Sequence, residues 1–138
     1  MDAKGRMLLP AMLLRQLPKA AKNKLVINRG YEKCLVLYAA NEFEEIADEV
    51  RKLNPHIKIN RDFARYFFRG ATELDLDAAN RLLLPKALLE HASIERELIL
   101  FAYNNIIEVW NPKMFEKKMA DEPMDFASMA EKIFGQQP

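Results

Sequence analysis

The sequence predicts an α+β protein built from two similar units, each rich in β-hairpins and flanked by helices. The first observation behind this prediction is an internal repeat. An Asp-x-x-x-Arg phrase followed by a proline occurs twice, 75 residues apart (77 − 2), at Asp2, Arg6 and Pro10 and then at Asp77, Arg81 and Pro85. The second observation is that "CLVLYAANEFEE" (34–45) is echoed by "IIEVWNPKMFEK" (106–117).

The first half of each unit reads as strand, turn and strand. Residues 71–77 alternate apolar and polar side chains, which is the period of a half-buried strand. The segment "RLLLP" (81–85) follows after a short break, so we expect 71–76 and 81–84 to pair as a hairpin. The residue before the arginine is Gly5 in one copy and Asn80 in the other, and both residue types accept a left-handed backbone in a tight turn.

The remaining strands and helices follow in the same order in both units. Pro10 and Pro85 suit the first turn of short helices over 11–17 and 86–92. A second hairpin then pairs "KLVIN" with "CLVLY" in the first unit and "ELILFAY" with "IIEVW" in the second.

Helices are expected to close each unit. Asn41 and Glu44 have the spacing of a capping box, with Phe43, Ile46, Ala47 and Val50 on one face of the helix that follows. Asn111-Pro112 predicts a capped helix through Met119. A connector over 54–60, a helix over 61–70 and a tail helix ending at Gly135 complete the chain.

The second unit has a strand before its Asp-x-x-x-Arg phrase, whereas the first has only Met1. A hairpin needs both arms, so we expect that about ten residues are absent from the front of this chain, by analogy with the second unit. The alternative is that another chain supplies the missing arm.

Composition sets further bounds. The 138 residues suffice for one domain or for two small halves that share a core, and the formal net charge of +1 excludes a diffuse polycationic binder. Cys34 is the sole cysteine, so no intrachain disulfide forms. The apolar runs are too short to span a bilayer, and charges begin at Asp2. We therefore expect a cytoplasmic protein without a membrane partner.

The phrases "DAKGRMLLPA", "INRGYEKCLVLY", "GATELDLDAANRLLLPKAL" and "IIEVWNPKMFE" together resemble the MraZ family of bacterial transcriptional regulators, from residue 2 to about residue 120. The resemblance implies an AbrB-like swapped-hairpin fold, in which two tandem repeats form one pseudo-symmetric β-barrel. It also implies a ring-shaped homo-oligomer on the nucleoid, which binds repeated promoter motifs and represses the division and cell-wall gene cluster, including its own promoter. The corresponding domains are a first repeat with its helix and connector (1–60), a second repeat (61–122) and a helical tail (123–138).

Candidate DNA-binding residues lie at and near the two hairpin tips. An arginine can bridge phosphate oxygens or take O6 and N7 of guanine, and a neighbouring aspartate can hold its guanidinium in place. Lysines and further arginines close in sequence could contact phosphates. The candidate set is Asp2, Lys4, Arg6, Arg15, Asp77, Arg81 and Lys86.

Each candidate also has a purely structural interpretation. The Asp–Arg pair could be a local salt bridge, Tyr38 and Trp110 are more often core residues than base-stacking ones, and the Arg61, Arg65, Arg69 stripe is more often a solvated face or a subunit contact. The alternative function is a protein-interaction or scaffold module that uses the same barrel without binding DNA.

Enzyme chemistry finds no support in the sequence. Ser93 and Ser128 stand in no nucleophile motif, and Cys34 lies in an apolar run where a thiol is usually inert. The chain has four scattered glycines and no phosphate-cradling loop, while His56 and His91 lack partners at metal-ligand spacing. We predict no catalytic residue, small-molecule substrate, cofactor or metal.

Overall fold

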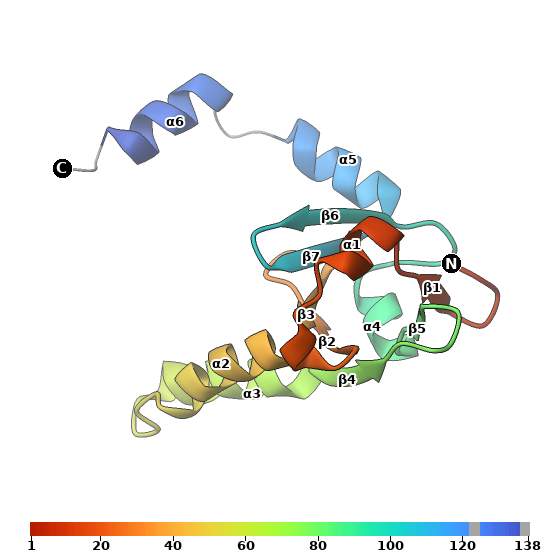
Figure 1. Ribbon diagram of the computed structural model, residues 1–138. Coiled ribbons are helices and arrows are strands. Elements are labelled where there is room, and N and C mark those ends of the chain that lie inside the picture. Colours follow the sequence, from red (N-terminus) through yellow and green to blue (C-terminus); the bar gives the residue numbers. More distant parts are fainter. Residues whose placement is uncertain (122–124, 136–138) are drawn as a thin grey trace.

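Strands carry most of the buried apolar residues and divide into two antiparallel sheets in the computed structural model, which describes residues 1–121 and 125–135 (Figure 1). The smaller sheet pairs β1 (Arg6–Leu8) with β5 (Arg81–Leu83). The larger sheet has the order β4-β2-β3-β7-β6. Its strands are β4 (Thr72–Asp75), β2 (Lys24–Arg29), β3 (Leu35–Ala39), β7 (Ile106–Trp110) and β6 (Ile99–Tyr103). The predicted hairpins β2–β3 and β6–β7 are confirmed.

The hairpin expected between residues 71–76 and 81–84 is wrong. β4 pairs instead with β2 of the first repeat, and β5 pairs with β1, so that Met7 lies opposite Leu82. The loop between them does close locally, because the N–H of Asp77 donates to the carbonyl of Arg81 at 3.0 Å. The two strands then diverge, and each repeat completes its sheet with a strand of the other. Two tandem repeats with exchanged hairpin arms therefore confirm the α+β swapped-hairpin class, although the strands form two separate sheets rather than one closed barrel.

Helices join and cover the strands. Both prolines stand at the N-cap, one position earlier than the first-turn site assigned to them, before α1 (Ala11–Arg15) and α4 (Lys86–His91). The turn η1 (Lys19–Ala21) leads into β2. The longer helices are α2 (Ala40–Arg51), α3 (Lys58–Gly70), α5 (Pro112–Ala120) and α6 (Phe126–Phe134). α3 begins three residues earlier than expected, and the part of the expected tail over 122–124 and 136–138 lies outside the described residues.

The two predicted helix caps have opposite outcomes. The Asn111 side chain caps α5 by accepting from the N–H groups of Lys113 and Met114 at 2.8 and 3.2 Å, as predicted. The Asn41 capping box is wrong, because β3 runs straight into α2 and leaves Ala39 at the N-cap. Asn41 is therefore already inside the first helical turn, and its buried Oδ1 has no hydrogen-bond partner among the described residues.

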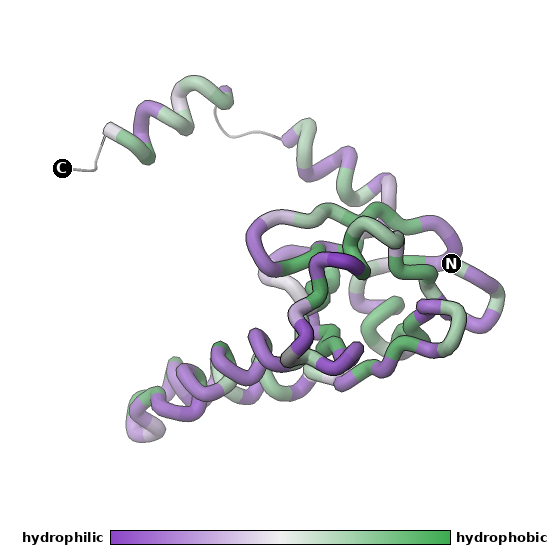
Figure 2. Tube along the Cα trace, in the orientation of Figure 1, coloured by the Kyte–Doolittle hydropathy of each residue, from purple (hydrophilic) through white to green (hydrophobic). Residues whose placement is uncertain are grey.

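The main core lies between the two sheets and the short helices α1 and α4. It contains Leu25, Ile27 and Val109 from the large sheet and Met7 and Leu82 from the small one, each at most 2% exposed. The apolar character of these strands and the polar surface of α2 and α3 are evident in Figure 2. On the opposite face of the large sheet, Phe43 and Ala47 of α2 pack on β2, as the predicted apolar face of that helix requires. Among the described residues, no helix has the length and apolarity needed to cross a membrane.

Candidate nucleic-acid interface

The first hairpin tip is held together by one aspartate. Asp2 accepts the backbone N–H groups of Lys4 and Arg6 on Oδ1 at 3.0 and 2.9 Å, and it accepts Nε of Arg6 on Oδ2 at 2.8 Å. Gly5 has φ +80°, which confirms the expected left-handed position in this turn. The carboxylate thus fixes the loop backbone and the arginine side chain together.

The second tip repeats this arrangement atom for atom. Asp77 accepts the N–H groups of Ala79 and Arg81 on Oδ1 at 2.9 and 2.8 Å, and Nε of Arg81 on Oδ2 at 2.9 Å. Asn80 has φ +62° and occupies the position of Gly5. The sequence repeat is therefore a repeat of hydrogen-bonded geometry.

The two tips lie side by side on one side of the molecule. The N–H of Leu84 donates to the carbonyl of Gly5 at 3.0 Å, and the N–H of Leu9 donates to the carbonyl of Asn80 at 2.9 Å. These reciprocal bonds obey the same 75-residue offset and indicate a local twofold axis between β1 and β5. Nη1 of Arg81 consequently lies 3.8 Å from Oδ2 of Asp2 in the other tip.

Both tip arginines remain accessible while being oriented. Their side chains are 30% and 34% exposed for Arg6 and Arg81, respectively. Each guanidinium is bonded to its own aspartate through Nε. Within residues 1–121 and 125–135, no hydrogen bond engages the Nη groups of either arginine, so these donors remain available to a ligand.

The electrostatics of both tips favour charged aspartates. The N–H of Arg6 lowers the pKa of Asp2 below its ordinary value of 3.8, with further contributions from the N–H of Lys4 and the Arg6 guanidinium. The N–H groups of Arg81 and Ala79 and the Arg81 side chain lower the pKa of Asp77 in the same way. Both carboxylates are therefore ionised at neutral pH.

The other candidate residues are distributed unevenly. Lys4 and Lys86 line the same open depression beside the first tip, which has a volume of about 740 Å³. Arg96 and Glu95 line it as well, and no motif in the sequence pointed to Arg96 because its role depends on the chain path after α4. Arg15 lies on exposed α1, where its Nε donates to the carbonyl of Ala11 at 3.4 Å, and it does not line this depression.

The aromatic and arginine alternatives occupy other places. Tyr38 packs against Phe43 at a ring distance of 5.4 Å, and Trp110 packs against Phe115 at 5.7 Å, which gives both repeats the same strand-to-helix contact. On α3, Arg65 pairs with Asp62 at 3.3 Å. These contacts are structural and lie apart from the tips.

One group of side chains has the spacing of metal ligands. Ligand atoms of Glu32, Cys34 and Glu108 lie within 4.8 Å of one another. Burial raises the pKa of the Cys34 thiol to about 12, with the Glu108 and Glu32 charges adding to the effect. The thiolate that binds metals is therefore strongly disfavoured, and we assign no metal to this group.

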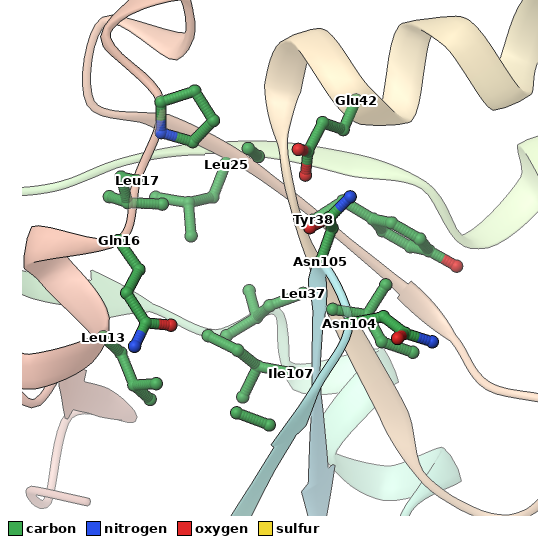
Figure 3. A pocket seen from close by; sticks show the side chains of 14 residues that line it. Leu13, Gln16, Leu17, Leu25, Leu37, Tyr38, Glu42, Asn104, Asn105 and Ile107 are labelled. Atoms are coloured by element: carbon green, nitrogen blue, oxygen red, sulfur yellow. The ribbon is translucent and has the colours of Figure 1, made fainter.

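A small cavity opens between α1 and the turn that joins β6 to β7. Figure 3 shows Leu13 and Leu17 facing Leu37 and Ile107 across it, with Asn104 among the polar residues at its margin. Its volume of about 130 Å³ is below the range of ordinary small-molecule sites. We interpret it as a packing gap at the end of the core.

Two interlocked repeats that present paired Asp–Arg tips define the class of tandem swapped-hairpin proteins. A family model described as "MraZ protein, putative antitoxin-like" matches residues 1–65 and again residues 67–136. The chain belongs to the MraZ family.

Similar proteins support this placement over nearly the whole chain. A protein from Cytophaga hutchinsonii named "Transcriptional regulator MraZ" is 41% identical over 95% of this chain and 87% of its own length. Proteins of the same name from Flavobacterium psychrophilum and Acetivibrio thermocellus are 37% and 33% identical over 97% and 96% of this chain, and over 86% and 90% of their own lengths. The chain is a transcriptional regulator and not an enzyme.

Proposed function

We propose that this regulator acts by binding double-stranded DNA through its paired hairpin tips. The observation that carries the proposal is the proximity of two arginines, Arg6 and Arg81, each held by its own aspartate and each with free Nη donors. A guanidinium in this state can take O6 and N7 of a guanine or bridge two phosphate oxygens. Because the tips are related by a local twofold axis, they suit a target that offers two equivalent contacts.

Lysines beside the tips would position the duplex. Lys4 and Lys86 meet at the depression next to the first tip, and Arg96 adds a third cation there. Contacts of this kind go mainly to phosphates and carry no sequence information. Arg15, on the neighbouring face of α1, is a further phosphate candidate if the DNA extends past the depression.

Assembly would supply the affinity that one copy lacks. The net charge of +1 and the few cations at the tips suggest weak binding by a single chain. A ring of identical copies would engage successive promoter repeats and raise the affinity through effective concentration. In this proposal the ring represses the division and cell-wall gene cluster, including its own promoter, and resides on the nucleoid.

Gel retardation with DNA from upstream of the chain's own gene tests this proposal. We expect Arg81→Ala and Arg6→Ala to abolish specific retardation, whereas Lys52→Ala, which removes one exposed positive charge from the end of α2, should leave it intact. Light scattering must show the same oligomer size for all three variants. Parental affinity in Arg81→Ala would refute the role of the tips.

Salt dependence separates the two kinds of contact. Replacing a phosphate-binding lysine, such as Lys86, should reduce the slope of log affinity against log salt by about 0.9 per lost contact, and it should weaken all DNA sequences alike. If the unmodified chain shows no DNA affinity at low salt while remaining oligomeric, the scaffold alternative replaces DNA binding.

A further inference from the structure

The large sheet is nearly symmetric, and its asymmetry lies at one edge. β3 and β7 form its centre, with β2 paired outside β3 and β6 paired outside β7. β2 is covered in turn by β4, whereas β6 has no strand beyond it in the part of the chain that the structure describes. Figure 1 shows β4 and β6 at the two margins of the sheet.

The strand register identifies equivalent residues at the covered and uncovered positions. Val26 pairs with Tyr38 and Ile99 pairs with Trp110, and Tyr38 and Trp110 are themselves equivalent in the repeat. The neighbours Leu98 and Leu100 are therefore the counterparts of Leu25 and Ile27. All four side chains face the main core.

These equivalent leucines and isoleucine differ in burial. Leu25 and Ile27 are 1% and 0% exposed, because β4 places Leu74 directly beside Leu25. Leu98 and Leu100 pack against the same core but remain only partly buried. The uncovered edge therefore leaves apolar core surface in contact with water, which costs free energy in proportion to its area.

The backbone of β6 is unpaired on the same side. At the covered edge, the N–H of Leu76 donates to the carbonyl of Asn23 at 3.4 Å, and antiparallel alternation then directs the N–H and C=O of Leu25 and Ile27 toward β4. The equivalent groups of Leu98 and Leu100 face away from β7. An open edge with apolar side chains and free backbone groups is a template for strand addition.

We propose that the outer edge of β6 is a docking site for one extended peptide segment of the β4 type, which binds antiparallel and places an apolar residue beside Leu98. The evidence for this occupant is the occupied equivalent, where Leu74 lies beside Leu25 and Glu73 points outward beside Val26. The segment must therefore alternate apolar and polar residues. Its exit would lie near Met1, which packs on the core in the place of Leu76 (76 − 75).

Amide hydrogen exchange in the full-length chain tests the docking site directly. The probe is a synthetic peptide with the sequence of residues 70–77, "GATELDLD", capped at both ends. At a peptide concentration ten times the dissociation constant, exchange of the Leu98 and Leu100 amides should slow by about tenfold. The amides of Leu25 and Ile27, already covered by β4, serve as internal references and should not change.

A control peptide of the same composition exchanges residues 75 and 76, so that its two leucines point to opposite faces. It should give no protection. Equal protection by both peptides, or no protection of Leu98 and Leu100 by the first peptide at millimolar concentration, would overturn the proposal.

A second measurement joins the segment to the chain. Fusing the same eight residues ahead of Met1 raises their effective concentration at the β6 edge to about millimolar, and we expect a higher Tm than for the control sequence fused at the same place. Identical melting temperatures for the two fusions would count equally against the proposal. Neither measurement involves DNA, so both outcomes are independent of the function proposed above.

Discussion

The neighbouring leucines Leu83 and Leu84 should respond very differently to the same substitution. Leu84 is 3% exposed and lies in the main core, while Leu83 is 59% exposed and points outward. Replacing either by alanine keeps the backbone, including the bond from the N–H of Leu84 to Gly5. Any difference in stability between the variants therefore arises from burial of the side chain.

The expected magnitudes follow from that burial. Leu84→Ala removes a buried side chain and leaves a cavity, which lowers the free energy of unfolding by about 2–5 kcal/mol. Leu83→Ala removes a mostly hydrated side chain and should change it by about 0.5 kcal/mol or less. For a chain of this length, the first substitution corresponds to a fall in Tm of roughly 6–20 °C.

Urea unfolding followed by circular dichroism measures both variants. We expect a lower midpoint for Leu84→Ala with an unchanged m-value, and a midpoint close to the parent for Leu83→Ala. The local twofold axis predicts the same contrast between Leu9→Ala and Leu8→Ala, because Leu9 is 2% and Leu8 61% exposed. Equal losses for the inner and outer leucines would refute the assignment of the inner leucines to a shared core.

Three further predictions concern the tips and the buried thiol. Asp77 should titrate below 3.8 in a carboxyl NMR titration; its contribution to tip stability is fully present above that pH and is lost as the pH falls through the lower, folded-state pKa. A midpoint at or above 3.8 would contradict the hydrogen-bonded tip. Gly5→Ala should lower the free energy of unfolding by about 1–2 kcal/mol because φ is +80°, whereas Asn80→Gly should be nearly neutral; equal effects in urea unfolding would exclude a strained turn. With a pKa of about 12 instead of 9.0, Cys34 should react with a thiol reagent at pH 8 roughly a thousand times more slowly than an unfolded control, and rapid labelling of the native chain would contradict its burial.

Local signals in the sequence predicted local structure well. The left-handed positions of Gly5 and Asn80, the cap at Asn111 and the apolar face of α2 all depend on residues close together in the chain, and the structure confirms them. Asn41 was misjudged because its cap assumed a loop before α2, and the continuous passage from β3 into the helix removes that loop.

Strand partners could not be predicted from the same signals. Alternation identifies residues 72–75 as a strand and shows which face is buried, but any edge with a matching apolar row can accept it. The choice of β2 over the nearby β5 depends on the exchange of arms between the repeats, which is a property of the whole fold. Likewise, the meeting of Lys4, Lys86 and Arg96 at one depression depends on that exchange, and only the first two were expected from their positions near the tips.

The exchange of β1 and β5 also constrains how the chain can acquire its structure during synthesis. Met7 finds its partner only at Leu82, and β2 finds its outer neighbour only at residues 72–75. An amino-terminal half emerging from the ribosome therefore holds two incomplete sheets until more than half of the polypeptide has been made. Conversely, two separately expressed halves, cut between α2 and α3, carry complementary arms and should reassemble into the parental fold when mixed.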